Sequence, residues 1–405
     1  MIKKYIPIIP FVPLQERASL LSRWKKSPFW QRFKSNFLVK KALSVWHAAR
    51  FYFFFKHFNY GSEFHGYVCR LPFEFAEITS SGEVSVCCYL PKNLGNVESR
   101  PFRKVWNSYF SRKLRASMLD GSFRYCDKSL CRSMQSFDAN LVRTDRLEGD
   151  NLNNVVKGMK VRLEGNLKTL SLGNDYSCNL ECPSCRTGMR KMNRDEINAQ
   201  WDRYIDILET VGPQLEMIHI AGDGDAFASQ FYDRVIRNTD WDRYPNLKIG
   251  FQTNGIALTE KKWIGLPNAV KARVAYVGIS IDGATAPTYE KLRLGGKFDS
   301  LIRNIEFLAS MPDKKTYGFP LNLNMIVQAQ NYHEIAALVE LGKSCGVDNV
   351  SFTYIRDWGT FPEGEYEQHA VHLSSHPEHQ RLLEVLKSPV LDEPFVDRGN
   401  LLHLS

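Results

Sequence analysis

Apolar and polar positions in the C-terminal part of the chain form two alternating patterns. Short apolar runs, typical of buried strands, alternate with longer segments in which apolar residues recur at helical spacing. We expect strands at residues 168–173, 215–222, 247–255, 274–283, 321–328 and 349–355. We expect helices between them at 199–212, 298–309 and 332–346. The last ends on Gly346, and glycine commonly terminates helices.

This alternation predicts an α/β fold with a parallel sheet and right-handed crossovers, either a barrel or an open doubly wound sheet. In both architectures ligands bind at the carboxyl ends of the strands. Upstream, residues 1–60 predict aromatic-rich helices, and the following segment combines short strand and turn signals with five cysteines. We therefore expect a helical arm (1–60), a small cysteine-rich domain (61–150) and an α/β domain (155–405).

The basic character of the chain is concentrated in the arm. Its twelve Lys and Arg oppose one acid, so the net charge of +9 leaves −2 for residues 61–405. Fifteen of the fifty aromatic residues also lie there. Three interpretations stay open: a helical wrap around the cysteine-rich domain, an arm on an anionic membrane surface, or recruitment of an anionic substrate or nucleic acid. Nucleic acid is the partner we least expect.

We expect a cytoplasmic protein, at the inner membrane face if the arm binds lipid. No apolar run approaches the roughly 18–20 residues that span a bilayer. The N-terminal sequence has a basic tip and an apolar run, but Pro7, Pro10 and Pro13 interrupt it and no small-residue cleavage site follows. Without a secretion signal, nine cysteines favour metal ligation in a reducing compartment over disulfides.

Three of these cysteines, Cys178, Cys182 and Cys185, follow the first strand of the α/β domain in the sequence YSCNLECPSCR. Thiolates at this spacing suit a soft metal or an iron–sulfur cluster. On a four-iron cluster, three thiolates leave one iron open to a substrate or cofactor, as at a catalytic metal. A zinc site completed by a distant Cys or His is the alternative.

This CxxxCxxC motif resembles that of the radical S-adenosylmethionine (SAM) superfamily. The resemblance implies an incomplete (β/α)6 barrel in which SAM chelates the open iron of a [4Fe–4S] cluster. The sequence AGDGDAFAS resembles the family's glycine-rich motif, and places Gly222, Gly224 and Asp225 near the methionine amino group. The family usually has Glu-Pro where this chain has Asp225-Ala226, and the shorter acid would rely more on backbone carbonyls.

Two further motifs extend the resemblance over about residues 165–360. QTNG matches the end of the third strand, and its Asn254 is expected in the cofactor site. SIDGATAPTYEKLR resembles the fourth-strand motif, which places Ser280 and Arg293 near the SAM ribose and carboxylate; arginine suits a carboxylate. Ser184 stands where the family often has an aromatic residue, so the packing of adenine is left open.

The cysteine-rich domain resembles the SPASM and twitch auxiliary-cluster modules. Twelve residues separate Cys69 from Gly82 and four separate Gly82 from Cys87, which fits their opening signature. The resemblance implies a second, fully ligated [4Fe–4S] cluster that transfers electrons, held by Cys69, Cys87, Cys126 and Cys131. The small number of cysteines favours the shorter twitch type, and the module precedes the barrel instead of following it.

Some assignments stay open in this domain. Cys88 is a spare thiol or replaces Cys87 as a ligand, and a structural zinc site is the alternative to the cluster. Cys345 is expected to pack in the core.

Together these features predict a radical SAM oxidoreductase that cleaves SAM reductively and abstracts a substrate hydrogen. The favoured reaction is the oxidation of a carbohydrate or glycan precursor, with a flavodoxin or ferredoxin as electron donor. The alternatives are an epimerase, a peptide-modifying enzyme, or a non-catalytic iron–sulfur or zinc protein with a nucleic-acid-binding arm.

Overall fold

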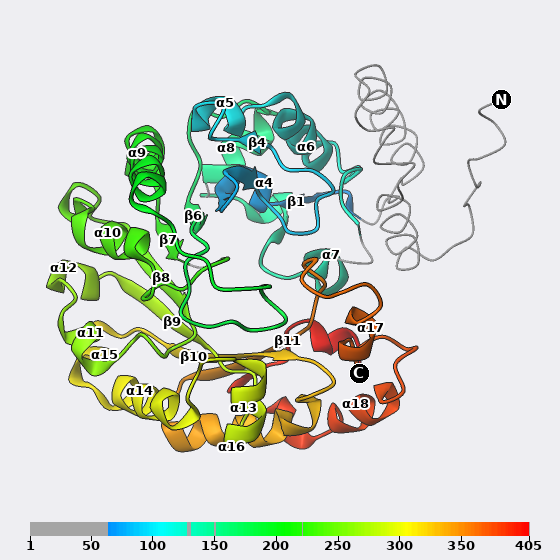
Figure 1. The fold of residues 1–405 in the computed structure, drawn as a ribbon. Coiled ribbons are helices and arrows are strands. Elements are labelled where there is room, and N and C mark those ends of the chain that lie inside the picture. Colours follow the sequence, from blue (N-terminus) through cyan, green and yellow to red (C-terminus); the bar gives the residue numbers. More distant parts are fainter. Residues whose placement is uncertain (1–63, 128–130, 150, 221, 405) are drawn as a thin grey trace, which may run out of the picture. The chain divides into compact units, whose positions relative to one another are not determined.

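A computed structural model describes residues 64–404 apart from 128–130, 150 and 221 (Figure 1). The chain divides into two units, Met1–Glu63 and Phe64–Ser405, so the described residues all belong to the second. The predicted arm, 1–60, lies outside the described residues.

The centre of the described unit is a ten-stranded sheet in the order β12-β11-β10-β9-β8-β7-β6-β2-β3-β4. Strands β6 to β11 are all parallel and neighbour one another in chain order, which confirms the predicted α/β class with six parallel strands. These strands are β6 (Thr169–Gly173), β7 (Met217–Ile220), β8 (Lys248–Thr253), β9 (Val274–Ser280), β10 (Leu321–Val327) and β11 (Asn349–Tyr354).

Helices lie along the outer face of this sheet (Figure 1). The main ones are α9 (Arg194–Val211), α10 (Gln230–Asn238), α11 (Glu260–Ile264), α13 (Ala286–Leu292), α14 (Phe298–Ser310) and α16 (Ile335–Cys345). Helix α9 begins at a capping box of Asn193 and Glu196. Helix α16 ends at Gly346 in the left-handed conformation, φ 72°, as the glycine predicted.

The two faces of the parallel strands differ in polarity. In β10, Leu321, Leu323 and Met325 are fully buried toward the helices. Asn322 and Asn324 alternate with them and are only partly buried. Because successive side chains of a strand point to opposite faces, the inner face of the sheet carries polar groups.

The cysteine-rich segment contributes strands to the same sheet. Strand β2 (Phe75–Thr79) pairs parallel with β6 and antiparallel with β3 (Glu83–Ser85), which pairs with β4 (Gly95–Asn96). Gly82 makes the β2–β3 turn at φ 73°, and a Cβ there would lie 2.5 Å from the Glu98 side chain. The tight hairpin expected at this glycine is therefore present.

Smaller elements complete the described unit. Strand β1 (Tyr67–Cys69) pairs antiparallel with β5 (Leu141–Arg143) in a separate two-stranded sheet. The unit also contains α4 (Leu71–Glu74), α5 (Phe102–Trp106), α6 (Tyr109–Leu119), α7 (Arg132–Ser136), α8 (Asn151–Lys157) and β12 (Val396–Asp397).

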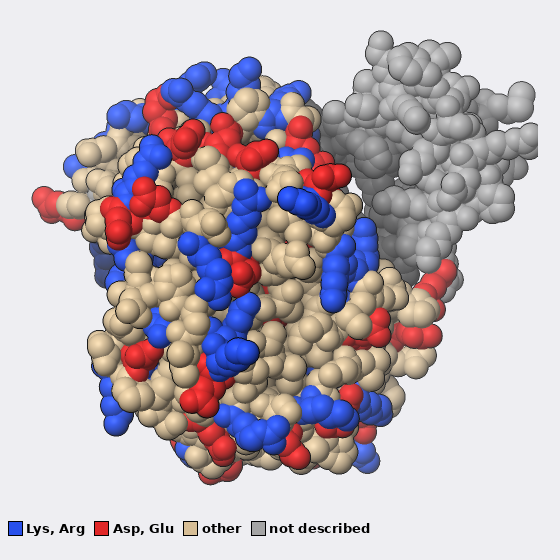
Figure 2. Space-filling view, turned by 60° about the vertical axis from the view of Figure 1, so that its left-hand side comes forward, with Lys and Arg blue, Asp and Glu red and all other residues tan. Residues whose placement is uncertain are grey.

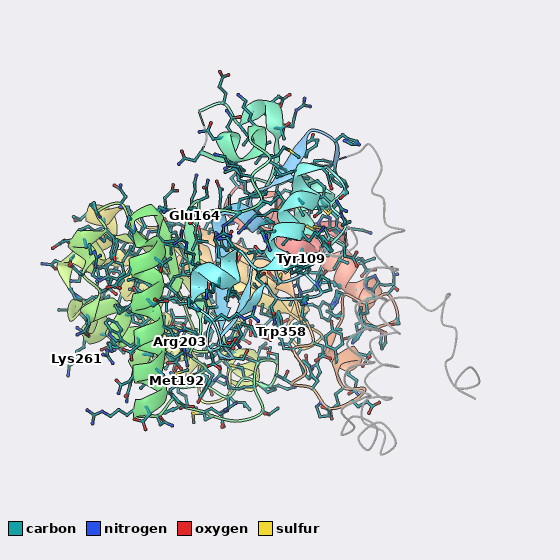
Figure 3. All side chains as sticks on the ribbon, turned by 90° about the horizontal axis from the view of Figure 1, so that it is seen from above. Tyr109, Glu164, Met192, Arg203, Lys261 and Trp358 are labelled. Atoms are coloured by element: carbon teal, nitrogen blue, oxygen red, sulfur yellow. The ribbon has the colours of Figure 1, made fainter. Side chains whose placement is uncertain are left out.

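Ion pairs connect the cysteine-rich segment with the rest of the unit. Arg203 on α9 pairs with Glu98 at 3.5 Å, and Arg103 on α5 pairs with Glu164; Figure 3 labels Arg203 and Glu164. On the face shown in Figure 2, basic and acidic side chains are interspersed. None of the described helices is long and apolar enough to cross a membrane.

Candidate active site

The three clustered cysteines lie on the loop between β6 and α9. Cys178 and Cys182 are buried, whereas Cys185 is exposed. The amides of Cys185 and Arg186 donate to the Cys182 carbonyl at 2.9 and 3.1 Å. This turn brings the thiols close enough to interact electrostatically, and burial raises the pKa of Cys178 and of Cys182. Ligation of a metal or cluster would require these thiols to lose their protons.

Each of these sulfur atoms also faces a different N–H donor. Asn254 Nδ2 donates to Cys178 Sγ at 3.5 Å, Arg293 Nη1 to Cys182 Sγ at 3.9 Å, and Arg186 Nη2 to Cys185 Sγ at 3.7 Å. Hydrogen bonds to sulfur tune the potential of iron–sulfur clusters. The donor set therefore fits three thiolates on a cluster, and Asn254 and Arg293, both predicted as cofactor residues, lie against Cys178 and Cys182.

The glycines after β7 allow two loops to approach closely. A Cβ on Gly222, which has φ 121°, would lie 2.4 Å from the Gly173 Cα atom. A Cβ on Gly224 would lie 2.4 Å from the carbonyl oxygen of Asp175 on the cysteine loop. Only glycine fits these contacts, so Gly222 and Gly224 place the backbone after β7 directly against the cysteine loop.

Asp225 is a buried anchor, 2% exposed. One carboxylate oxygen accepts from Thr253 Oγ1 at 2.8 Å and the Asn254 amide at 2.7 Å. The other accepts from the amides of Phe227 and Ala228 at 3.0 and 3.1 Å. Four donors of its own chain occupy this carboxylate, so contact with a cofactor would come from its backbone.

Ser280 and Arg293 lie on the carboxyl side of β9. The Ser280 hydroxyl accepts from Gln252 Nε2 at 2.8 Å. The Arg293 Nε atom lies 2.8 Å from Asp282 Oδ2, and the Asp282 side chain is only 1% exposed. Despite burial, Asp282 and the Cys182 thiol raise the pKa of Arg293. Arg293 is thus a fixed cation beside the cysteine loop.

A polar row continues from Ser280 across the inner face of the sheet. Asn324 Nδ2 donates to Gln252 Oε1 at 3.2 Å, and Ser351 Oγ donates to Asn324 Oδ1 at 2.5 Å. These residues come from β8, β10 and β11. They present hydrogen-bonding groups next to the predicted cofactor residues.

The second cysteine set also converges. Cys69, Cys87, Cys126 and Cys131 come from separate segments, yet Cys69 interacts electrostatically with the other three. Burial, partly offset by the Leu71 amide, raises the pKa of Cys69 to about 12. Among the described residues, no three His, Cys, Asp or Glu side chains are arranged to ligate a single metal ion.

Cys88 has its own environment. Hydrogen bonding to Cys87 and the nearby Arg356 lower its pKa to about 6, although burial raises it. Arg356 Nη1 donates to Cys88 Sγ at 3.6 Å, and the guanidinium lies 4.5 Å from the Tyr89 ring centroid. A cavity of about 420 Å³ is lined by Cys87 and Cys88. The segment after β11 therefore touches the cysteine-rich part.

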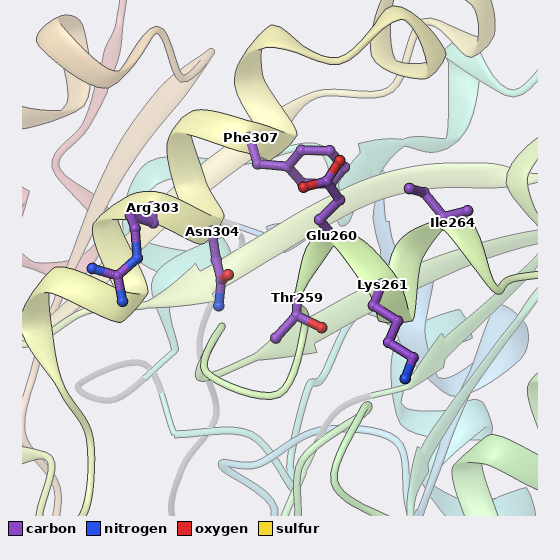
Figure 4. Close-up of a pocket in the computed structure, with 7 residues that line it drawn as sticks. All are labelled: Thr259, Glu260, Lys261, Ile264, Arg303, Asn304 and Phe307. Carbon is purple, nitrogen blue, oxygen red and sulfur yellow. The ribbon is translucent and has the colours of Figure 1, made fainter.

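A second cavity, of about 600 Å³, lies between α11 and α14 (Figure 4). Lys261, Arg303 and Phe307 are among its lining residues. It belongs to the helical layer outside the sheet and contains no cysteine, so it is separate from both cysteine sites.

Comparison with known proteins supports the iron–sulfur interpretation of the cysteine sites. Residues 69–133 match the SPASM family, described as an iron–sulfur cluster-binding domain. A segment of 178 residues is 28% identical to mycofactocin maturase MftC of Mycolicibacterium smegmatis, covering 42% of this chain and 40% of that protein. Another is 27% identical over 176 residues to the AdoMet-dependent heme synthase of Methanosarcina barkeri, covering 42% of this chain and 45% of that protein. Residues 69–133 thus match a SPASM domain, and over less than half of its length the chain is similar to radical SAM enzymes.

These similarities support SAM and iron–sulfur clusters as the cofactors, as predicted. The SPASM match spans Cys69, Cys87, Cys88, Cys126 and Cys131 and precedes Cys178, Cys182 and Cys185 in the chain. The chain spans less than half the length of the relatives it matches. The distinction between SPASM and twitch types, and the assignment of individual cysteines, stay predictions.

The superfamily match also includes weaker relatives. PqqA peptide cyclase of Rhodopseudomonas palustris is 22% identical over 190 residues, covering 45% of this chain and 46% of that protein. Among solved structures, Streptococcus suis SuiB bound to S-adenosylmethionine aligns with 62% of this chain and 52% of that chain, at 15% identity and a TM-score of 0.40.

Sequence reasoning missed three residues of this radical SAM site. Arg186 contacts the exposed Cys185 thiol and donates a hydrogen bond to the Asp223 carbonyl in the loop after β7. Asp282 forms an ion pair with Arg293. The position of Arg186 directly after the last cysteine was a usable signal. Asp282 lies in the same motif as its partner Arg293, so it too could have been found, whereas the partners of Asp223 are distant in the sequence.

Proposed function

We propose that this chain is a radical SAM enzyme in which Cys178, Cys182 and Cys185 hold a [4Fe–4S] cluster whose open iron binds SAM. The observation that carries the proposal is the convergence of three thiols, each facing its own N–H donor, at the carboxyl ends of parallel strands. When bound, the reduced cluster and SAM supply an organic radical that abstracts a hydrogen atom from the substrate.

The chain's own residues bind and orient these groups. Gly222 and Gly224 leave backbone carbonyls accessible to the methionine amino group, and Asp225 fixes that loop. Arg293, held by Asp282, offers a cation to the methionine carboxylate, and Ser280 a hydroxyl to the ribose. The six parallel strands fit the incomplete (β/α)6 barrel expected for this family.

We assign the auxiliary cluster to Cys69, Cys87, Cys126 and Cys131. Four thiolates saturate a four-iron cluster, so this site suits electron transfer better than substrate binding. A cluster held by these residues would supply an acceptor for the electron lost by the substrate radical, which makes net two-electron oxidation the leading reaction. A flavodoxin or ferredoxin in the cytoplasm is the proposed electron donor.

A peptide is the substrate class with the best support. The relatives include an enzyme named as a peptide cyclase, whereas none of the comparisons favours a carbohydrate, the class that the sequence first suggested. The polar row of Gln252, Asn324 and Ser351 suits peptide amides, which donate and accept hydrogen bonds.

The decisive test is anaerobic incubation of reconstituted protein with SAM and dithionite. We expect 5′-deoxyadenosine to form, and deuterium from a labelled peptide substrate to enter it. Protein with a full complement of iron that leaves SAM intact would refute the proposal. Deuterium transfer from host carbohydrates, and not from peptides, would restore the carbohydrate alternative.

The role of the arm is a separate proposal. If residues 1–60 bind anionic lipid, the full chain should sediment with anionic liposomes and a chain lacking them should not. If the full chain ignores liposomes and the shortened chain is insoluble, a structural wrap is the better explanation.

A further inference from the structure

Arg186 connects three parts of the site that come from different regions of the chain. Its Nη1 atom donates to the Tyr176 carbonyl at 3.0 Å, at the start of the cysteine loop. Its Nη2 atom donates to the Asp223 carbonyl, between Gly222 and Gly224, and lies 3.7 Å from Cys185 Sγ. One guanidinium therefore reaches both ends of the cysteine loop and the loop proposed to bind SAM.

Asp223 extends this connection to the cysteine-rich segment. Its carboxylate accepts a hydrogen bond from Ser80 Oγ at 2.5 Å. Ser80 lies in the turn between β2 and β3, which belongs to the SPASM part of the chain. The backbone of Asp223 is thus held by the cysteine loop, and its side chain by the SPASM hairpin.

The charge of Arg186 is placed to act on the cluster. The guanidinium is partly buried, and its Nε atom has no hydrogen-bond partner among the described residues. A fixed positive charge beside a thiolate ligand stabilises the reduced, more negative cluster, and low local dielectric strengthens that effect.

Another arginine on the same loop provides a comparison. The Arg190 guanidinium lies 4.5 Å from the Tyr176 ring centroid, and Arg190 is exposed. None of its hydrogen bonds in the described structure reaches the loop after β7. If the positive charge of the loop alone set the reduction potential of the cluster, replacing Arg190 would shift that potential as much as replacing Arg186.

We propose that Arg186 is a positioning residue that locks the cysteine loop against the SAM-binding loop through Asp223 and sets the reduction potential of the cluster. This inference rests on the proposed function, which places the cluster and SAM at this site. The Ser80–Asp223 hydrogen bond makes the lock sensitive to the SPASM hairpin. Substrate or redox events in that module can therefore reach the loop that grips SAM.

The test compares Arg186→Gln, Arg186→Lys and Arg190→Gln in the full chain. Amide hydrogen exchange at residues 222–226 is measured in the protein without iron, and the cluster's midpoint potential and SAM affinity in the reconstituted protein. In Arg186→Gln we expect faster exchange, a more negative potential and about tenfold weaker SAM binding, while iron content is kept. In Arg186→Lys the potential should recover but not the exchange protection, because an ammonium cannot bridge two carbonyls and a thiol as a guanidinium does.

Further variants distinguish the proposed lock from an effect of loop charge alone. Ser80→Ala should speed exchange at residues 222–226 without changing the potential, and Arg190→Gln should change neither. An unchanged midpoint potential in Arg186→Gln overturns the proposal. An equal negative shift of the potential in Arg190→Gln overturns it as well. If wild-type protein binds iron but not SAM, the proposed function fails, yet the exchange experiment still decides whether Arg186 forms the lock.

Discussion

At the scale of single residues, the site separates side chains that ligate from side chains that hold the ligands in place. The three thiols of the cysteine loop are the proposed ligands, and Asn254, Arg186 and Arg293 donate to them. Asp225 and Asp282 then hold the donors' loops through buried carboxylates. Loss of a ligand should abolish a cluster, whereas loss of a holding residue should first cost stability.

The ligand Cys185 offers the cleanest test of this division. It is exposed, so Cys185→Ala removes a cluster ligand without opening a cavity in the core. We expect the variant to lose the SAM-binding cluster and all formation of 5′-deoxyadenosine under dithionite, with its unfolding transition nearly unchanged. The matched control is Cys345→Ala on α16, a buried core cysteine that should keep both clusters and full SAM cleavage. Product formation by Cys185→Ala would exclude this cysteine as a ligand.

Arg293 should act on stability and on SAM binding at the same time. Arg293→Ala leaves the 1%-exposed Asp282 side chain without its ion-pair partner, which typically costs about 3–5 kcal/mol in unfolding free energy. Loss of a charge-assisted pair with the SAM carboxylate should weaken SAM binding by about 1.5–3 kcal/mol. Urea unfolding measures the first effect and anaerobic SAM titration the second. Normal SAM affinity in a destabilised variant would leave Arg293 with a structural role only.

At the scale of elements, alternation of apolar and polar residues was enough to predict the six parallel strands β6 to β11. The prediction of the strands succeeded because each strand is buried on its helix-facing side, as Leu321, Leu323 and Met325 show. The pairing of β2 with β6 could not be predicted, because β2 is short and about ninety residues of other structure separate the two. The SAM-loop glycines were predicted by motif, but the contact that requires Gly222, its approach to Gly173, appears only in three dimensions.

The inner face of the sheet carries a pH-sensitive pair. His219 Nδ1 on β7 lies 2.6 Å from Tyr276 Oη on β9, across Gly250 on β8, which leaves room for the Tyr276 ring. Burial lowers the pKa of His219 to about 4, below the value of about 6.5 for an unfolded chain. The unfolded state therefore binds the proton first, so this contribution to stability is complete above pH ~6.5 and is lost as pH falls toward 4.

His219→Gln should remove this dependence while keeping a hydrogen bond to Tyr276. Between pH 7 and pH 5 we expect wild-type protein to lose roughly 1–2 kcal/mol of unfolding free energy relative to the variant. Urea unfolding at the two pH values measures the difference. His372, whose pKa burial also lowers to about 4, is unchanged in both proteins and cancels in the comparison. Parallel pH profiles would show that His219 protonates freely in the folded state.

At the scale of the whole molecule, the SPASM part and the α/β part share one sheet and several direct contacts. Strand β2 pairs with β6, Ser80 binds Asp223 beside the cysteine loop, and Arg356 after β11 binds Cys88. The sequence indicated two modules and their order, but not this union, because every one of these contacts joins residues far apart in the chain. The two proposed clusters consequently sit in one connected framework, and changes at one are expected to reach the other.

The last prediction separates the roles of the two clusters within that framework. Fully reconstituted protein should hold about eight irons per chain, as two four-iron clusters. Replacing Cys126 and Cys131 together by Ala should reduce this to about four, because only the SPASM ligands are removed. SAM cleavage without substrate should remain measurable, since the thiols of the cysteine loop and the Gly222–Asp225 loop are intact. Substrate turnover should be lost, because an oxidised product requires an acceptor for its second electron.

Three measurements on the same preparation decide between the outcomes: iron content, 5′-deoxyadenosine and product. Cys88→Ala is the matched control, and it should keep eight irons if Cys87 is the ligand, as proposed. A fall to about four irons in Cys88→Ala would reassign the ligand to Cys88. Turnover that survives in the double variant would instead indicate a redox-neutral reaction such as epimerisation, with a structural role for the SPASM cysteines. Zinc in place of iron at those positions would support the same conclusion, because Zn²⁺ is redox-inactive and cannot accept an electron from the substrate.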